Sequence, residues 1–474
     1  MDVDTNMDGG LQPAFEPQPV FEQSNVRTQA APVDPAKKML DLVFIQDCTG
    51  SQGSYISSAT KNIEAICAYI FESGKLQHPE DLRVGLIAFR DHPPQDHTYI
   101  TRNFGFSSDI SKVHKDLSSL YASGGGDGPE AITAALAEVL KMDWREHASK
   151  MVVLIADAPP HGIGEYGDGF DDGSPDGYDP LQLVREMAAR GITLFFVACE
   201  PALSGYSYAT DFYQAITDIT SGLMLPLTTA DLLAHAIVGS VLENLDMERL
   251  IREVGQAVAR RIIGDNQSVD DVARELHETL KLRNESTKKV VIESIYKESE
   301  EAKHNVNVFV MSSSLAEARP QLKRVHGTRF TDKYLQSRQH LSRHSYPMGS
   351  LYTPSRSPPP RIKPLPTSPT TSPGIFPRSP PSSPPRKVVS DFATFGVSKN
   401  ASVFGTAVQS APFSVAGGTA AFGALRPGIS RTGFEDDEDE DENVGQKVEL
   451  RESEISLEQA KRIAMQSTWR SLRS

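Results

Sequence analysis

Six short apolar runs alternate with helical patterns between residues 40 and 245, and this alternation limits the possible folds more than any other feature. Strands are predicted over residues 40–46, 83–90, 99–102, 150–156, 192–199 and 223–225. Helices are predicted over residues 51–73, 110–120, 129–141, 180–189 and 211–219, and from residue 229 onward. Such an order is typical of a doubly wound α/β domain with a mostly parallel sheet. Ligands of such sheets bind outside the carboxyl ends of the strands.

The first predicted strand runs directly into the sequence Asp47-Cys48-Thr49-Gly50-Ser51. One carboxylate and two hydroxyls therefore lie where a strand opens into a loop. Hard oxygen donors of this kind suit Mg²⁺ or Mn²⁺. The same residue types are common in helix caps and turns, so the cluster indicates a metal site only if other loops contribute to it.

Two later segments supply polar groups at comparable places. A glycine-rich turn over residues 123–130 contains Asp127 and leads into a predicted helix. The apolar run 150–156 is followed by Asp157, which repeats the order of strand and aspartate found at Asp47. We therefore expect three loops to converge on one divalent ion.

These three ordered motifs resemble the von Willebrand factor A domain, whose metal-ion-dependent adhesion site combines an Asp-x-Ser/Thr-x-Ser loop, a glycine-rich loop and an aspartate of a third loop. The resemblance covers residues 40–245 and continues more weakly over residues 282–287 and 329–332. The whole is similar to intracellular members of the family, including the non-catalytic region of alpha-kinases that carry this domain. The resemblance implies that Mg²⁺ or Mn²⁺ is bound by Asp47, Thr49, Ser51, Asp127 and Asp157.

In this family an acidic side chain from a protein partner completes the coordination of the ion. The resemblance therefore implies a metal-dependent protein–protein interaction module. Asp127 departs from the commonest pattern, because many members carry Thr at this position. Three aspartates around one dication should tighten metal binding but weaken the attraction of an acidic partner. We therefore expect Asp127 to weaken the capture of an acidic side chain.

We expect an adaptor or scaffold that is not an enzyme. One alternative is a regulatory component related to alpha-kinase signalling, and another is a calcium-sensing scaffold. The calcium alternative depends on an acidic loop over residues 165–179, which partly matches an EF-hand loop. The matching positions are Asp168, Asp172, Gly173, Ser174, Asp176 and Asp179. Phe170 stands at a ligand position, so an ordered surface loop that sets partner choice is the other interpretation.

Composition adds several expectations. Three cysteines favour a reducing compartment, and we expect the cytoplasm, with the nucleus as an alternative. Acidic residues at 165–179 and 435–442 account for the whole net charge of −14, which leaves no strongly basic face for nucleic acid. No apolar run is long enough to predict a membrane span. His92, His97 and His161 lack metal-ligand spacing, so we expect them to face solvent and predict no zinc site.

After residue 245 the pattern predicts helices over 247–263, 269–282 and 289–303 and a short strand over 306–310. A capping-box pattern at Ser456 and Gln459 predicts a last helix, which we expect either to dock a partner or to be transiently helical. The expected division of the chain is a disordered N-terminal segment (1–38), the α/β domain (39–245), a helical extension (246–335), a disordered Pro/Ser-rich and acidic region (336–450) and the C-terminal helix (451–474).

Overall fold

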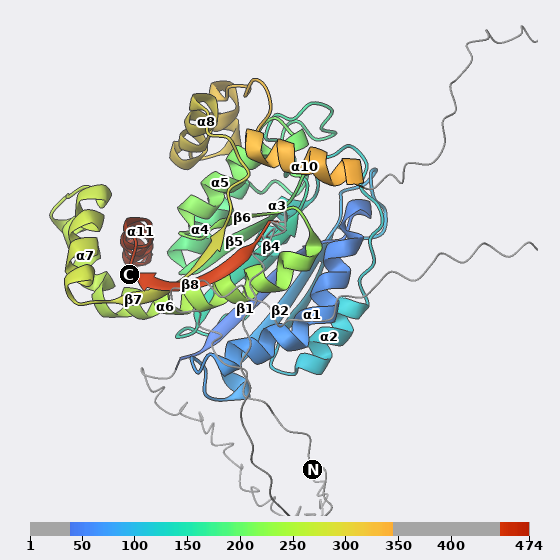
Figure 1. Cartoon of the computed structure of the whole chain (residues 1–474). Helices are drawn as coiled ribbons and strands as arrows, with labels where there is room; N and C mark the ends of the chain where they lie inside the picture. The colour runs from blue at the N-terminus through green and yellow to red at the C-terminus, as the bar shows by residue number, and fades with distance from the viewer. Residues whose placement is uncertain (1–37, 345–445, 474) are drawn as a thin grey trace, which may run out of the picture. The chain divides into compact units, whose positions relative to one another are not determined.

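The computed structural model describes residues 38–344 and 446–473 of the chain (Figure 1). Of the segments expected to be disordered, residues 1–37 and 345–445 lie outside these described residues. The described residues begin at the first strand of a central sheet, and their last part is a strand followed by a helix.

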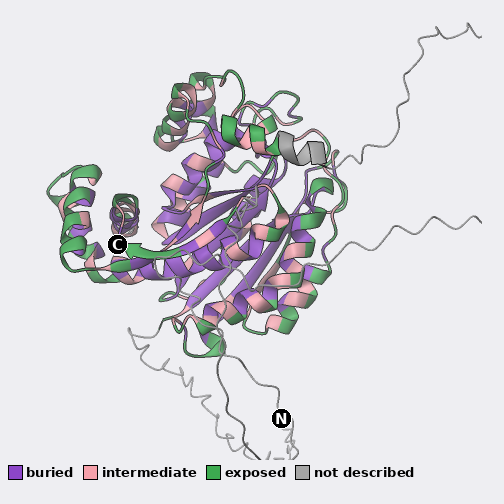
Figure 2. Cartoon of the chain, in the orientation of Figure 1, coloured by how far each residue is buried: buried purple, intermediate pink, exposed green. Residues whose placement is uncertain are grey.

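The central sheet has six strands in the order β3-β2-β1-β4-β5-β6. Only β3 runs antiparallel to its neighbour. β1 and β5 are buried along their whole length, because helices cover both faces of the sheet (Figure 2). The strands are β1 (Leu40–Asp47), β2 (Leu82–Phe89), β3 (Thr101–Ser107), β4 (Ser149–Ala156), β5 (Ile192–Cys199) and β6 (Met224–Leu227).

Side chains alternate between the two faces of each strand, so neighbouring residues of β1 enter different cores. Leu42 and Phe44 pack with α1, α2 and α6, whereas Val43 and Ile45 pack with α3, α4 and α5. The prediction of a doubly wound α/β domain is thus confirmed. The helices are α1 (Gly53–Glu72), α2 (Ile110–Ser118), α3 (Ile132–Lys141), α4 (Pro180–Ala189), α5 (Ala209–Ile219) and α6 (Leu233–Ala259).

The part of the chain after α6 differs from the prediction. The expected strand over 306–310 is wrong, because these residues belong to a helix, and the expected helix over 289–303 is wrong, because a strand begins it. Asn305, Val308 and Phe309 are buried at helical spacing, and Phe309 packs edge-on against Phe212 of α5. The alternation of valines in the sequence concealed this helical stripe. The elements are α7 (Val269–Leu282), β7 (Ser286–Ile292), α8 (Glu300–Met311), α9 (Leu315–Ala318) and α10 (Asp332–His344).

The C-terminal segment forms β8 (Val448–Glu454) and α11 (Leu457–Arg473), drawn in red in Figure 1. β8 pairs antiparallel with β7, and α11 packs against α6 and α7. Ile463 is fully buried in a third apolar core, which also contains residues of α6 and α7. The boundary expected at residue 245 falls inside α6. The last helix, expected either to dock a partner or to be transiently helical, packs on its own chain. Ser456 and Gln459 form the predicted capping box.

None of the helices in the described ranges combines the length and the apolar composition needed to cross a membrane.

Candidate metal centre

Acidic residues follow three adjacent parallel strands at the same edge of the sheet. Asp47 ends β1, Asp157 comes directly after β4, and Asp91 lies two residues beyond β2. Since β2, β1 and β4 are neighbours, their carboxyl ends bring these three loops together. Asp91 was missed in the sequence, although it repeats the order of strand and aspartate that singled out Asp47 and Asp157.

Backbone hydrogen bonds join the glycine-rich turn to the loops that follow the strands. The Ser123 amide donates to the Cys48 carbonyl oxygen at 3.0 Å, and the Glu130 amide donates to the Pro159 carbonyl oxygen at 2.9 Å. The turn therefore lies between the loop after β1 and the loop after β4. The three loops converge as the sequence predicted.

Asp47 is fully buried and only half satisfied by hydrogen bonds. Its Oδ1 accepts from the Thr49 amide at 2.8 Å and from the Thr49 hydroxyl at 2.7 Å. Its Oδ2 has no hydrogen-bond partner among the described residues. Burial, followed by the nearby charge of Asp157, raises the pKa of Asp47 to about 7. Ser51, the other predicted hydroxyl ligand, lies in the one-turn helix Gly50–Gln52 and is exposed.

Glu130 is a further candidate ligand that the sequence analysis did not assign. Its side chain is 5 % exposed, and its Oε2 lacks a hydrogen-bond partner in the described part of the chain. A Cβ atom on Gly125, whose φ is +84°, would lie 2.7 Å from Glu130 Oε1 and 3.5 Å from Thr49 Cβ. The Glu130 carboxylate therefore reaches the Asp47–Thr49 loop across the space that this glycine leaves open.

The surroundings of Glu130 are strongly negative. Burial, and then the charges of Asp47, Asp91, Asp127 and Asp157, raises the pKa of Glu130 to about 10. The sequence placed Glu130 in the first turn of a helix starting at residue 129, where an acidic residue is ordinary. In the structure α3 begins only at Ile132, so Glu130 stays in the loop.

Asp127, the predicted ligand of the second loop, is oriented toward the acidic loop. Its Oδ2 accepts from the Gly169 amide at 2.5 Å and from Gln95 Nε2 at 3.2 Å. Asp127, Asp91 and His161 each offer one possible ligand atom, and these atoms lie within 4.8 Å of one another. The predicted set is thus divided: Asp47, Thr49 and Asp157 lie together, whereas Asp127 groups with two residues that the sequence analysis did not select as ligands.

The prediction that His92 and His161 face solvent is wrong, because they are 2 % and 1 % exposed. His161 lies between two carboxylates, with Nε2 at 2.8 Å from Asp91 Oδ1 and Nδ1 at 2.7 Å from Asp168 Oδ1. Burial by itself lowers the pKa of His161, but the hydrogen bonds with Asp168 and Asp91 outweigh it and raise the pKa to about 9. His97 is exposed, as predicted.

The acidic loop uses its first and last expected calcium positions for local structure. Asp168 accepts from the amides of Gly162 and Phe170 at 2.7 and 2.9 Å, in addition to its contact with His161. Asp179 caps α4 by accepting from the Leu181 amide at 2.9 Å. These two carboxylates thus serve separate local structures instead of one ion-binding loop.

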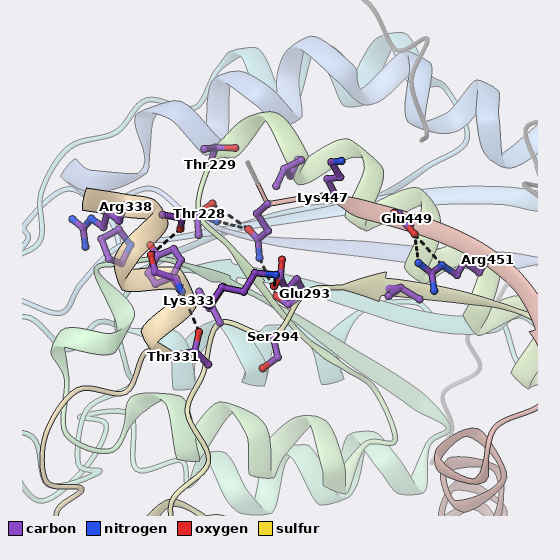
Figure 3. Close-up of a pocket in the computed structure, with 17 residues that line it drawn as sticks. Thr228, Thr229, Glu293, Ser294, Thr331, Lys333, Arg338, Lys447, Glu449 and Arg451 are labelled. Carbon is purple, nitrogen blue, oxygen red and sulfur yellow. Dashed lines mark hydrogen bonds and ion pairs between the residues drawn. The ribbon is translucent and has the colours of Figure 1, made fainter. Parts of the chain in front are cut away.

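A cavity of about 660 Å³ lies elsewhere, between the β7–β8 ribbon and α10 (Figure 3). Two of its lining cations are paired, since Lys333 Nζ lies 2.6 Å from Glu293 Oε1 and Arg451 Nη2 lies 2.6 Å from Glu449 Oε2. None of the candidate metal ligands lines it. The cavity is therefore separate from the carboxylate-rich edge of the sheet, which remains the strongest candidate site.

Comparison of the sequence with known protein families identifies the class to which this fold and its acidic edge correspond. Residues 41–222 match the von Willebrand factor type A domain. The chain therefore contains a von Willebrand factor type A domain, and the resemblance inferred from its motifs is confirmed.

Two curated proteins are similar in sequence to part of this chain. The alpha-protein kinase vwkA of Dictyostelium discoideum is 32 % identical over 165 residues, which are 34 % of this chain and 25 % of vwkA. The putative ariadne-like RING finger protein R811 of Acanthamoeba polyphaga mimivirus is 30 % identical over 200 residues, 41 % of this chain and 19 % of that protein. This chain thus spans a quarter or less of the length of these curated relatives.

A solved von Willebrand factor type A structure from Catenulispora acidiphila is 14 % identical and has a TM-score of 0.29. The match covers 44 % of this chain and 43 % of that one.

Proposed function

We propose that this chain is an adaptor or scaffold that binds a protein partner through a divalent metal ion at the carboxyl edge of its sheet. Mg²⁺ or Mn²⁺ would be held by Asp47, Thr49, Ser51 and Asp157, four of the five residues predicted from the sequence. Glu130 takes the place of Asp127 in this assignment. Asp127 is left out because it is held toward the acidic loop by the Gly169 amide and Gln95 and groups with Asp91 and His161 instead.

One observation carries the proposal: Asp47 Oδ2 and Glu130 Oε2 are buried carboxylate oxygens without a hydrogen-bond partner among the described residues, and the two carboxylates are close enough for the charge of Asp47 to raise the pKa of Glu130. A buried carboxylate is costly unless it is protonated, paired with a cation or bound to a metal. A dication would satisfy both oxygens at once. Oxygen donors without sulfur or nitrogen favour Mg²⁺ or Mn²⁺.

The exposed side of this centre is where a partner would approach. Gly50 and Ser51 are exposed, so a ligand from another protein can reach an ion held by Ser51. Asp47, Glu130 and Asp157 together outweigh the charge of one dication. An acidic side chain of the partner would therefore gain less from the ion than at a site with fewer carboxylates, whereas a neutral oxygen ligand would not be repelled.

Metal binding is tested with the full chain after removal of bound ions by chelator. Titration calorimetry should detect binding of Mg²⁺ or Mn²⁺ to the wild type and its loss in Asp47→Ala. Asp143→Asn is the matched control, because Asp143 has a side chain that is 98 % exposed and lies outside the centre. Absence of binding in the wild type, or equal binding in Asp47→Ala, would contradict the proposal.

Partner binding is tested by affinity purification on the wild type, Asp47→Ala and Asp143→Asn, each with and without chelator. We expect a partner that is retained by the wild type and by Asp143→Asn in Mg²⁺ and is lost in chelator or in Asp47→Ala. A partner retained equally under all these conditions would show that recognition does not use the ion.

A second candidate function is a regulatory role related to alpha-kinase signalling, which the similarity to vwkA favours. We propose that the chain itself acts by binding and not by catalysis. Incubation of the purified chain with labelled ATP and a divalent ion should give no autophosphorylation. Incorporation of label that survives removal of trace kinases would overturn this proposal.

The cysteines bear on the compartment. Cys48, Cys67 and Cys199 are all buried and free, which suits a reducing environment. We therefore propose a cytoplasmic location, which fractionation of cells expressing the full chain would test.

A further inference from the structure

A second group of possible metal ligands lies beside the proposed ion. It consists of Asp91 from the loop after β2, Asp127 from the glycine-rich turn and His161 from the loop after β4. One ligand atom from each of these residues lies within 4.8 Å of the other two. Three loops of the α/β domain thus bring two carboxylates and one imidazole to the same place.

Two of these residues have oxygens that the protein does not satisfy. Asp91 is fully buried, and its Oδ2 finds no hydrogen-bond partner within the described ranges. Asp127 Oδ1 is likewise enclosed and without a partner there. Buried polar atoms in native proteins almost always have partners, so these two oxygens beside one imidazole are available as ligands to a cation.

The ring of His161 is held in place through its Nδ1 atom. Asp168 contacts Nδ1 at 2.7 Å, and Asp168 is itself fixed by the amides of Gly162 and Phe170. A carboxylate that holds one ring nitrogen of a histidine directs the other nitrogen toward the metal, as in many metal sites of proteins. Here the other nitrogen, Nε2, lies 2.8 Å from Asp91 Oδ1.

We propose that Asp91, Asp127 and His161 bind a second divalent ion of the transition-metal class, with Zn²⁺ as the best match, and that Asp168 positions His161. Imidazole with two carboxylates suits Zn²⁺ better than Mg²⁺, which prefers oxygen ligands and retains its waters. Three protein ligands leave a fourth tetrahedral position for water or for a group of a partner.

Some ligand atoms must move together and others apart when the ion binds. Zinc bonds of about 2.0–2.1 Å place tetrahedral ligands about 3.4 Å apart, which is more than the 2.8 Å between His161 Nε2 and Asp91 Oδ1 and less than the 4.8 Å within which all three ligand atoms lie. The ion would enter between His161 Nε2 and Asp91 Oδ1, and any proton shared there would pass to solvent. Asp127 would bind through Oδ1, because its Oδ2 accepts hydrogen bonds from the Gly169 amide and Gln95.

The local charge also favours two ions over one. Five carboxylates lie close together here. The pKa of Glu130 is raised by the charges of four neighbours, which are Asp47, Asp91, Asp127 and Asp157. One dication would leave most of this negative charge in place, whereas a second dication at Asp91 and Asp127 would neutralise much of the remainder. The second site does not depend on the first, since the two sets of ligands share no residue.

The test uses the full chain, stripped by chelator, returned to excess Mg²⁺ and then exposed to Zn²⁺. After gel filtration, elemental analysis of the wild type should find one zinc ion per chain. His161→Asn and Asp91→Asn should lose this ion, and Asp168→Asn should weaken its binding by about 10-fold or more. Asp47→Ala should retain the zinc ion, because Asp47 belongs only to the first site. His97→Asn is the matched control, since His97 is exposed and lies near Asp91 in sequence.

X-ray absorption at the zinc edge of the wild type gives a second measurement that needs no variant. It should show imidazole scattering from one histidine, which the first site, built from oxygen ligands, cannot supply. The proposal is overturned if the wild type retains no zinc, or if His161→Asn retains as much zinc with the same absorption spectrum. If Asp47→Ala no longer binds Mg²⁺ but retains its zinc ion, the zinc ion is bound at a site separate from the Mg²⁺ site.

Discussion

The two ends of strand β1 each contain a fully buried aspartate, and the two aspartates differ in their hydrogen-bond partners. At the start of the strand, Asp41 accepts hydrogen bonds from Arg83 Nε at 3.0 Å and from Arg145 Nε at 2.8 Å. At the end of the strand, Asp47 is bonded by Thr49 and has an oxygen without a partner among the residues described. Among the described residues, the chain pairs the first carboxylate with two arginines and pairs the second with no cation. Burial of an acid alone therefore does not indicate a metal site, and the lack of a paired cation is what distinguishes Asp47 from Asp41.

The largest change in the free energy of unfolding is expected for Asp41→Ala, which tests this contrast at the start of the strand. This variant leaves Arg83 and Arg145 without their shared carboxylate, and breaking a buried ion pair on one side costs about 3 kcal/mol or more of unfolding free energy. Urea unfolding in chelator measures the loss. Affinity of the folded protein for Mg²⁺ should stay unchanged, and a loss of metal affinity in a folded Asp41→Ala protein would contradict the structural role of this end.

Asp47→Asn should behave in the opposite way. In chelator its free energy of unfolding should stay near that of the wild type, because the amide still accepts from Thr49 and no longer repels Asp157. In Mg²⁺ at about 100 times the dissociation constant, the wild type should gain about 2.7 kcal/mol that the variant does not gain. Thermal unfolding with and without Mg²⁺ measures this difference, and an equal gain in both proteins would remove Asp47 from the site.

Glu130→Gln should change how stability depends on pH. In the metal-free protein the pKa of Glu130 is about 10, above its ordinary value of 4.5, so the folded chain binds more protons than the unfolded chain. Stability is therefore lost as the pH rises from the unfolded value toward the folded value. Between pH 6 and pH 8 the metal-free wild type should lose about 2.7 kcal/mol relative to Glu130→Gln, at about 1.36 kcal/mol for each pH unit.

The measurement for Glu130 is a series of urea titrations in chelator across this pH range. Saturating Mg²⁺ should flatten the pH dependence of the wild type, because an ion holds the carboxylate in its charged form. Parallel pH profiles for the wild type and Glu130→Gln in chelator would show that Glu130 is not the buried acid described above.

The smallest effect on stability is expected for Gly125→Ala. A matched variant at Gly105 separates the backbone strain from the contact that the new Cβ atom makes with Glu130. Both Gly125 and Gly105 have a positive φ, where an L-residue is strained by about 1 kcal/mol or more. A Cβ atom on Gly105 meets nothing within 4 Å, whereas one on Gly125 would approach Glu130 Oε1. Both variants should lose stability, but only Gly125→Ala should lose affinity for Mg²⁺ in a calorimetric titration. Equal Mg²⁺ affinities of the two variants would show that Glu130 does not contact the ion.

The sequence predicts the sheet and most helices because periodicity reports directly which faces are buried. α7 and β5 have the predicted bounds. The prediction fails over residues 289–310, where β7 pairs with a strand that begins at Val448. A local pattern carries no information on a partner so far along the chain, and α8 was misread because its valines alternate.

The candidate centre shows the same limit of local patterns. Asp47 and Asp157 are recognisable because each follows an apolar strand, and Asp91 could have been found by the same rule. His161 could not, because its role depends on contacts with Asp91 and Asp168, which come from different loops or turns. Glu130 resembles an ordinary helix start until the structure shows that α3 begins later.

The pairing of β7 with β8 has a consequence for the segment that separates them in the sequence. Ile292 lies opposite Val448, and α11 is packed against α6, so the chain before and after residues 345–445 is held in one body. Those residues are thus connected at both ends, in the manner of an insertion and not of a tail. A single proteolytic cut within them would give two fragments that stay associated through the ladder of β7 and β8 and the apolar contacts of α11.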